Sequence, residues 1–493
     1  MPVFGYCHAI HRPLPASRQG LAHPEREGFT MINSDSTIRT SLPAEIGKEE
    51  EDKVFRRVTR GILPLLFICS MIALFDRFIV GFAKLQITEA FGLSAAAYGF
   101  GAGIFSLGYL LFEVPSNVIL ARVGAKKWIA RIMVSWGIVT VGTILVRTPE
   151  QFYMARFLLG LMEAGFYPGI VYYLSGWFPR ARFGRVMALL LLVFPISNLF
   201  IGPLSGWILE SMSGTAGLAG WQWLFVVMGI PAILMGFVFF LLVADKPQDA
   251  KWLSAHEKRV VLDAIARDRA SRHESGGWFL AFKDWRVWAL GAIMAGGYLG
   301  LYGIVFWLPT MVQSAGVSGF RNIGLISSIP WIGTVLVTLV LGYSSDYFQE
   351  RRGHFCFAVL VGALGFVISV QSSTNIYITI AGLSVACAFL FACFPPAWAL
   401  ASTLLVGQSA ACGLALVNTV ASFGSFIGPY LMGVGQERTG SLTVPLMVMA
   451  AICSVSALAI WLIPAHSPGQ SGAGSRALTD PKTGGSVADS MAQ

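Results

Sequence analysis

An uncharged stretch of 82 residues, from Phe355 to Gln436, constrains the fold of this chain more than any other feature. A second stretch without Asp, Glu, Lys or Arg covers 34 residues, from Val287 to Phe320. Soluble domains carry about a quarter charged residues, whereas this chain has 12% charged and 55% hydrophobic residues. Because one membrane span needs about 20 apolar residues, we expect an all-α membrane protein.

Apolar segments long enough to span a bilayer recur twelve times between two polar tails. The predicted spans are 60–83, 96–120, 128–146, 151–177, 186–209, 221–243, 286–311, 322–344, 354–372, 375–398, 409–434 and 442–464. One long polar insertion separates six helices from six. The predicted organisation is therefore a disordered tail (1–55), a first six-helix half (56–243), a central loop (244–285), a second half (286–465) and a disordered tail (466–493).

The central loop contains apolar residues at helical spacing among charges. They are Trp252, Leu253, Val260, Val261, Ala264 and Ile265. This pattern predicts an amphipathic helix, which either lies on the membrane surface or serves as a solvated connector.

Lys and Arg are distributed unevenly over the loops. With the N-terminus inside the cell, the inner segments hold 20 of them and the outer loops hold 4. Cytoplasmic loops carry the excess of Lys and Arg, so both termini are expected in the cytoplasm. The net charge of +9 then reflects membrane orientation, and no nucleic-acid partner is expected.

Three pairs of positions indicate an internal repeat. The Gly-Pro pairs at 202–203 and 428–429 are 226 residues apart, and Pro168 and Pro395 are 227 apart. Placing Ala121 opposite Asp346 gives an offset of 225. These offsets predict two pseudo-symmetric six-helix halves, and transporters built from such repeats bind substrate near the midplane between the halves.

At residues 117–127 the chain resembles the loop signature of the major facilitator superfamily. The first copy keeps Arg122, Gly124, Lys126 and Lys127 but has Ala121 in place of the acidic residue. The second copy keeps Gly342, Asp346, Arg351 and Arg352. This resemblance implies gating or structural roles for Arg122, Lys126, Asp346 and Arg351.

Five charged residues lie in the interior of predicted spans of the first half, at least five positions from either end of the span. They are Asp76, Arg77, Glu113, Arg156 and Glu163. A charge at the bilayer centre costs about 2.5–3.5 kcal/mol on insertion scales, so such residues are functional by default. Arg156 and Glu163 are seven positions apart and share a helix face, separated by roughly 10 Å along the axis.

These charges admit two interpretations. One is a structural ion pair that locks the first and fourth helices together. The other is an anion site, in which arginine supplies a permanent charge with a fork that suits a carboxylate and acidic residues take up protons. Proton and anion then favour each other's binding. Glu113 is expected to contact Arg131 or the basic loop at 122–127 instead, as a gate or structural pair.

Within that superfamily the chain is similar to the anion:cation symporter family over about residues 55–465. The matching segments are 76–83, 98–105, 113–117, 156–169, 177–179 and 250–254. The resemblance implies that Arg77 binds a substrate carboxylate, that Asp76 and Glu163 accept protons, with Arg156 pairing one of them, and that Tyr109 faces substrate. Relatives usually have Asn where this chain has Ile79, which implies a less polar pocket.

Further pocket candidates come from the second half, where packing is the alternative role. They are Tyr302, Trp307, Trp398, Asn418 and Ser422. The predicted function is a secondary transporter that imports an organic anion with protons by alternating access; the family's substrates include sugar acids, tartrate, phthalate and aromatic carboxylates. Proton-coupled efflux and a nontransporting sensor are the alternatives. We expect no enzymatic activity, cofactor or metal, and a monomer in the inner membrane.

Overall fold

The computed structural model describes residues 47–270, 278–371, 375–405 and 410–463. These residues form helices and loops and contain no strand. Most of the predicted N-terminal tail and the whole predicted C-terminal tail lie outside the described residues. The predicted tail boundary at residue 55 is wrong, because the first helix already begins at Lys48.

Seventeen α-helices and four short 3-10 helices make up the described part. They are α1 (Lys48–Phe91), α2 (Ala95–Val123), α3 (Ala125–Gly142), η1 (Thr143–Leu145), α4 (Pro149–Glu163), α5 (Phe166–Ser175), α6 (Arg180–Leu191), α7 (Val193–Ser211), η2 (Thr215–Gly217), α8 (Gly220–Leu242), η3 (Pro247–Asp249), α9 (Ala255–Ala270), α10 (Trp278–Lys283), α11 (Trp285–Ser314), α12 (Phe320–Tyr347), α13 (Arg352–Val370), α14 (Ile376–Ala392), α15 (Phe394–Leu404), α16 (Ala410–Thr439), α17 (Thr443–Ala459) and η4 (Ile460–Leu462).

Twelve helices or helix pairs among the described residues are long and apolar enough to span a membrane. The prediction of twelve spans is therefore confirmed, although several are broken in the middle. The fourth span consists of α4 and α5, the fifth of α6 and α7, and the tenth of α14 and α15. Such breaks are tolerated in membrane helices where neighbouring groups satisfy the freed backbone.

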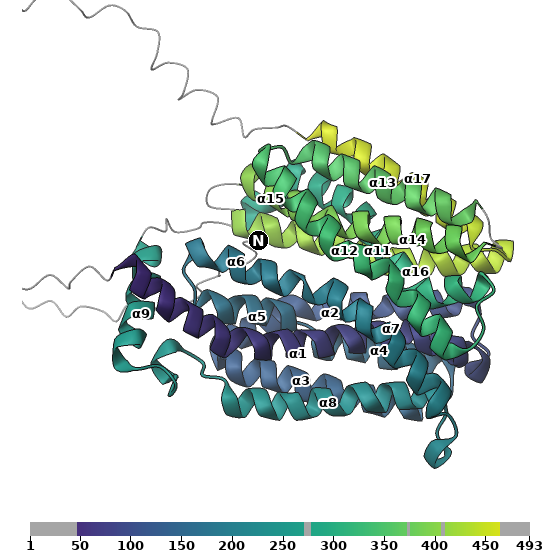
Figure 1. Ribbon diagram of the computed structural model, residues 1–493, viewed down its shortest axis with the longest axis horizontal. Helices are drawn as coiled ribbons and strands as arrows, with labels where there is room; N and C mark the ends of the chain where they lie inside the picture. The colour runs from purple at the N-terminus through teal and green to yellow at the C-terminus, as the bar shows by residue number, and fades with distance from the viewer. Residues whose placement is uncertain (1–46, 271–277, 372–374, 406–409, 464–493) are drawn as a thin grey trace, which may run out of the picture.

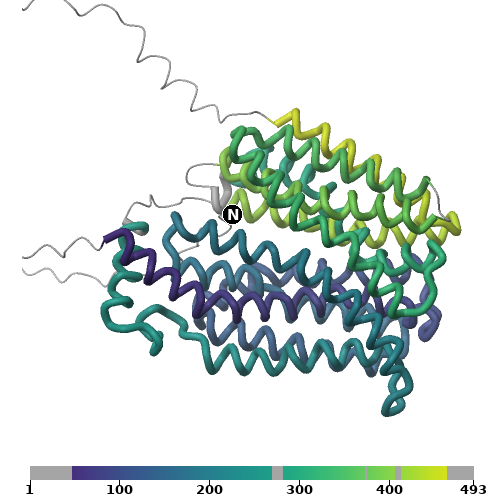
Figure 2. The backbone as a smooth tube through the Cα atoms, viewed as in Figure 1, coloured from purple at the N-terminus to yellow at the C-terminus, as the bar shows by residue number. Residues whose placement is uncertain are grey.

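The helices form two bundles that lie side by side (Figures 1 and 2). The first bundle contains α1 to α8, and the second contains α11 to α17. Three helix pairs join the bundles: α2 packs on α16, α7 on α12, and α1 on α11. The predicted architecture of two six-helix halves is confirmed.

The halves meet at one end of the bundle. We call this the seal end, where α1 ends at Phe91 and α2 begins at Ala95, and we call the opposite end, which carries the start of α1 and α9, the basic end. At the seal end the Ser94 hydroxyl donates a hydrogen bond to Glu437 of α16 at 2.6 Å. A second contact at the seal end joins α12 to α7, where the backbone N–H of Arg321 donates a hydrogen bond to the Glu210 carboxylate at 3.0 Å.

Glycines bring the two halves into backbone contact at the seal end. A Cβ atom added to Gly202 of α7 would clash with the carbonyl oxygen of Gly324 of α12, and the reverse also holds. Small residues of this kind let membrane helices approach closely. The seal therefore depends on the absence of side chains at this crossing.

The amphipathic helix of the central loop packs on protein. The apolar face of α9, including Val260 and Val261, is fully buried. Beside it, Trp252 stacks on Trp177 with ring centroids 5.9 Å apart, and Arg57 of α1 pairs with Glu257 at 2.9 Å. The membrane-surface interpretation is thus not supported, because the first half covers the apolar face.

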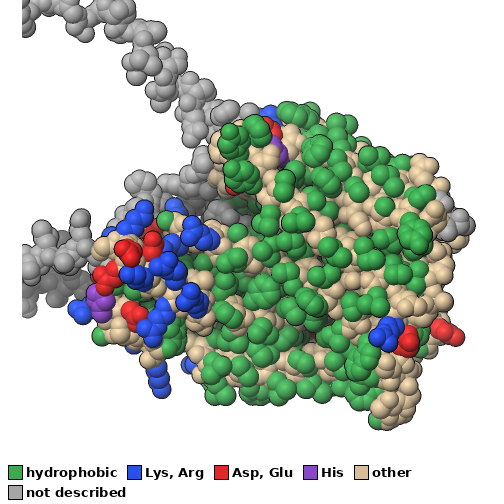
Figure 3. All heavy atoms as spheres, viewed as in Figure 1, with side chains coloured by type: hydrophobic (Ala, Val, Ile, Leu, Met, Phe, Trp, Pro, Cys, Tyr) green, Lys and Arg blue, Asp and Glu red, His purple; other side chains and the backbone are tan. Residues whose placement is uncertain are grey.

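Charge is segregated on the molecular surface. Figure 3 shows a largely apolar face along the bundle, with Lys, Arg, Asp and Glu gathered over α9 and the start of α1. Exposed side chains such as Leu241 and Tyr377 lie along the spans, where lipid rather than water is the expected solvent.

Candidate functional site

An ion pair between α1 and α4 forms the centre of the candidate site. The Arg77 guanidinium donates a hydrogen bond to the Glu163 carboxylate. The Glu163 side chain is 2% exposed, whereas that of Arg77 is 17% exposed. Arg77 therefore keeps part of its charged surface free for another partner.

A break between α4 and α5 places Glu163 at a helix end. Glu163 is the last residue of α4, and Gly165 follows with a φ of 88°, a left-handed conformation that favours glycine. The Ser116 hydroxyl of α2 donates to the carbonyl oxygen of Ala164 at 2.7 Å. This bond satisfies a carbonyl that the broken helix leaves open.

A second arginine and a second carboxylate lie buried beside this pair. Arg156 of α4 is 1% exposed, and Asp76 of α1 is fully buried. Asp76 interacts electrostatically with both arginines. Neither the Arg156 guanidinium nor the Asp76 carboxylate makes a hydrogen bond to a described side chain, although Thr140 lies close to Asp76.

Aromatic rings separate and cover the two cations. The Arg77 guanidinium carbon lies 4.8 Å from the centroid of the Phe105 ring, and that of Arg156 lies 5.1 Å from it. Cation–π contacts of this length stabilise a desolvated guanidinium. The charges of Arg77, Arg156, Asp76 and Glu163 balance formally, so protonation of Asp76 or Glu163 leaves these four side chains with a net positive charge.

The tyrosines predicted to face substrate flank Arg77 from opposite halves. The ring centroid of Tyr109 on α2 lies 5.0 Å from the Arg77 guanidinium carbon. Tyr302 on α11 interacts electrostatically with Arg77. Its ring stacks on that of Tyr298, with the ring centroids 6.0 Å apart. Both Tyr109 and Tyr302 are partly exposed. Side chains from both halves thus surround Arg77.

The remaining pocket candidates are engaged in other contacts. Trp398 is packed in α15 with 5% exposure, and the Ser422 hydroxyl donates to the carbonyl of Asn418 within α16. Trp307 is fully buried, and its indole N–H donates to the carbonyl of Pro429 at 3.1 Å. Ile79 is also fully buried in the core.

The expected contact of Glu113 with Arg131 is not formed among the described residues. Arg131 instead stacks on Trp128, with the guanidinium carbon 4.5 Å from the ring. Glu113 is partly buried on α2 and interacts electrostatically with Arg77. Its helix face therefore points it to the charged cluster rather than to the basic loop.

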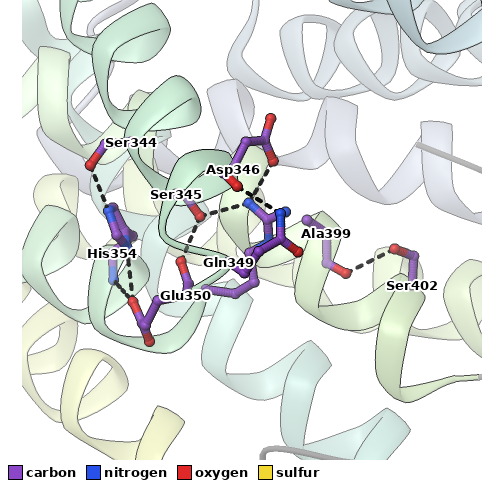
Figure 4. A network of polar contacts seen from close by, with 9 residues as sticks. Ser344, Ser345, Asp346, Gln349, Glu350, His354, Ala399 and Ser402 are labelled. Carbon is purple, nitrogen blue, oxygen red and sulfur yellow. Dashed lines mark hydrogen bonds and ion pairs between the residues drawn. The ribbon is translucent and has the colours of Figure 1, made fainter.

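The loop signature of the second half forms a local network. Arg351 pairs with Asp346 at 2.6 Å and donates to the Ser345 hydroxyl at 2.9 Å. The Ser345 hydroxyl in turn donates to the carbonyl of Glu350 (Figure 4). This network fixes the turn between α12 and α13.

The corresponding loop of the first half uses a residue that the sequence did not single out. The backbone N–H of Lys126, in the first turn of α3, donates to the Asp245 carboxylate at 2.9 Å. Asp245, which follows α8, supplies a carboxylate to this loop, in which Ala121 stands where the signature has an acidic residue. A carboxylate at a helix N-terminus is favourable. Arg122 is exposed.

Two further contacts between the halves involve residues that no sequence pattern marks. The Ser425 hydroxyl of α16 donates to that of Ser106 on α2 at 3.0 Å. The Lys84 ammonium group donates to the Thr310 hydroxyl of α11 at 3.0 Å. Lys84 lies within α1, one residue beyond the predicted first span of 60–83.

A small hollow lies between the halves, beside the residue after Arg77. Its lining is mostly apolar and includes two polar side chains, Asn198 of α7 and Ser327 of α12. The full lining is Phe78, Phe82, Asn198, Ile201, Val305, Leu308, Pro309, Ser327 and Trp331.

Comparison with known proteins identifies relatives along most of the chain. The family model described as the Major Facilitator Superfamily matches residues 66–429 and, in a second match, 320–484. A Pseudomonas putida protein named for metabolite transport, NicT, is 41% identical over 84% of this chain and 94% of its own length. An Acinetobacter baumannii protein named as a quinolone resistance transporter is 38% identical over 82% of this chain and 93% of its own length.

An Agrobacterium vitis protein named as a tartrate transporter is 37% identical over 85% of this chain and 93% of its own length. Among solved structures, an inward open conformation of the xylose transporter XylE from Escherichia coli superposes with a TM-score of 0.67. That match covers 85% of this chain and 98% of the other at 13% identity, so it shows a shared fold.

Proposed function

Because the chain belongs to the major facilitator superfamily, whose members are membrane transporters and not enzymes, we propose that it imports an organic anion together with protons. The two halves provide alternating access to a site at Arg77. The protein acts as a monomer in the inner membrane with both termini in the cytoplasm.

The partly exposed Arg77, paired with Glu163, is the observation that carries this proposal. An arginine fork binds a carboxylate with two parallel hydrogen bonds, and Arg77 has a competing carboxylate already in place. Protonation of Glu163 removes that competitor, and the anion then takes its place on Arg77. Binding of one ligand therefore favours the other by the same factor.

The charge distribution supports the direction of access. The basic end carries the excess of Lys and Arg, which places it in the cytoplasm. The halves contact each other at the seal end through Ser94 and Glu437, and Tyr98 donates to the carbonyl of Phe306 at 3.1 Å. In this assignment the structure is closed to the outside, and Arg77 is reached from the cytoplasm.

The substrate class follows from the chemistry of the cluster and from the relatives. The partly exposed Arg77 guanidinium, with the buried Arg156 beside it, suits an anion. The Tyr109 and Tyr302 rings suit the carbon face of a sugar acid or an aromatic acid. A relative named as a tartrate transporter supports a small carboxylate.

The test is uptake of labelled acids into proteoliposomes of known orientation. The panel contains tartrate, a sugar acid, phthalate and a hydroxybenzoate, each with and without an imposed inward proton gradient. Accumulation of one acid that depends on the gradient supports import with protons. Equal uptake with and without the gradient contradicts proton coupling, and binding without accumulation contradicts transport.

Export is a second candidate function, favoured by the relative named as a quinolone resistance transporter. The same vesicles, loaded with the acid or with a quinolone, distinguish the two directions. Net export driven by a proton gradient in the physiological direction would replace import by export.

A further inference from the structure

Lys84 is a buried cation with no acidic partner among the described ion pairs. The residue is 6% exposed, and lysine is almost never fully buried unless it is paired. Its ammonium nitrogen lies 3.7 Å from the Trp307 ring centroid and 5.2 Å from that of Tyr98. The ammonium group also donates a hydrogen bond to the Thr310 hydroxyl.

The three partners of Lys84 are Tyr98, Trp307 and Thr310, which we call the lysine cage. They come from both halves. Lys84 and Tyr98 belong to α1 and α2, whereas Trp307 and Thr310 belong to α11. The Tyr98 hydroxyl donates to the carbonyl of Phe306, so the cage lies within the seal. If the halves separate at the seal end, Lys84 loses Trp307 and Thr310 together and faces the opening.

The position of Lys84 on α1 relates it to the candidate site. Lys84 follows Arg77 by seven positions, which places both on one helix face about 10 Å apart along the axis. Both meet α11 across the interface, at Thr310 for Lys84 and at Tyr302 for Arg77. A solute that enters from the seal end therefore passes Lys84 before it reaches Arg77.

The residues of the lysine cage leave Lys84 able to bind an anionic solute for a short time. A carboxylate within the cage would compete with an anionic solute for Lys84, whereas ring faces and a hydroxyl carry no net charge. An ammonium group is a compact, strongly hydrated charge that lacks the bidentate fork of arginine. It attracts an anion without fixing its orientation, which suits capture and release.

We propose that Lys84 is an anion-docking residue on the seal side of Arg77, exposed when the seal opens and enclosed by the lysine cage when it closes. The docked ligand is a small carboxylate. This inference rests on the proposed anion import, to which it adds a first contact for the substrate.

The first experiment compares uptake from the seal side by wild type, Lys84→Gln and Lys84→Arg. We expect Lys84→Gln to raise the KM about tenfold with a nearly unchanged maximal rate, and to weaken the dependence of uptake on ionic strength. Lys84→Arg should retain most of the wild-type KM. The matched control is Arg321→Gln, which removes an exposed cation at the same end and should leave the KM unchanged.

A purely structural lysine gives a different result. If Lys84 only stabilises the seal, Lys84→Gln changes the maximal rate and leaves the KM and its salt dependence as in wild type. That outcome overturns the docking role while the uptake of wild type still supports the proposed function.

A second experiment needs no transport. Acylation of the Lys84 amine is followed by mass spectrometry in wild type and in Gly202→Val, whose added side chain should hold the seal open. We expect faster acylation in Gly202→Val and slower acylation when tartrate or benzoate is added. In a Gly202→Val protein whose seal is shown to be open by the distance between spin labels at the exposed positions Ser213 and Ser318, a wild-type acylation rate, or no protection of Lys84 by either acid, overturns the docking role even if wild type transports none of the acids.

Discussion

The Arg77 guanidinium on α1 donates a hydrogen bond to the Glu163 carboxylate on α4. The residue assigned to anion binding and a residue assigned to proton uptake thus form one ion pair. In the proposed mechanism, substrate and Glu163 compete for the same guanidinium, so a proton on Glu163 acts directly on substrate affinity. The coupling then needs no long pathway between two separate sites.

Replacement of Arg77 by lysine should reduce uptake about 10–100-fold at equal membrane insertion. The change keeps the charge but loses the fork, and a hydrogen bond to a charged group contributes about 1.5–3 kcal/mol. Initial uptake rates in proteoliposomes measure the effect. Arg131→Lys is the matched control, since Arg131 contacts Trp128 and not the cluster. Uptake at the wild-type rate by Arg77→Lys would contradict the assigned role.

Replacement of Glu163 by glutamine should separate exchange from accumulation. The amide mimics the protonated acid, so Arg77 stays available to the anion but no proton is carried. We expect retained exchange of labelled for unlabelled acid and loss of gradient-driven accumulation. Glu150→Gln, at the exposed start of α4, should behave as wild type. Accumulation that still follows the proton gradient in Glu163→Gln would exclude this residue as the proton acceptor.

The sequence predicted the charged cluster because charges are rare in apolar helices and each one stands out. It could not predict which arginine pairs with which acid, because Arg77 and Glu163 are brought together by the packing of α1 on its neighbours. Lys84 was missed for a related reason. Its span was predicted to end one residue earlier, and its burial depends on contacts with α2 and α11.

The role of Asp245 was also outside the reach of sequence patterns. The loop signature has an acidic residue where this chain has Ala121. The carboxylate that accepts a hydrogen bond from the Lys126 N–H belongs to Asp245, which is 119 positions further along the chain. Spacing arguments work within a helix or a loop, whereas this contact depends on how the end of α8 meets the start of α3.

Replacement of Gly202 by valine should hold the seal end open. The added side chain meets the backbone of Gly324 on α12, and backbone cannot move aside as a flexible side chain can. Spin labels at the exposed positions Ser213 and Ser318 should report a longer distance across the seal than in the unsubstituted protein. Gly333→Val, where a Cβ meets open space, is the control. An unchanged distance in Gly202→Val would show that the crossing adapts.

The attachment of α9 should depend more on Trp252 than on its ion pairs. Trp252 stacks on the buried Trp177 and fills the space beside Gly61 of α1, so Trp252→Ala should cost about 2 kcal/mol. Glu257→Gln should cost less than about 1 kcal/mol, as expected for a pair with an exposed arginine. Thermal unfolding in detergent should therefore show the larger decrease in Tm for Trp252→Ala.

The smaller contribution of Glu257 should also depend on pH in one direction. The backbone N–H of Ser254, together with Arg57, holds the pKa of Glu257 below its usual value. A group with a lowered folded-state pKa stabilises the protein above its unfolded-state pKa and loses this effect as the pH falls through the lowered value. The Tm difference between wild type and Glu257→Gln should thus be present at neutral pH and vanish in acid. The control for the Trp252 prediction is Lys251→Ala, because Lys251 is an exposed neighbour of Trp252. This variant should leave the Tm unchanged. A decrease as large as that of Trp252→Ala would mean that the loop as a whole, rather than the stacked ring, holds α9.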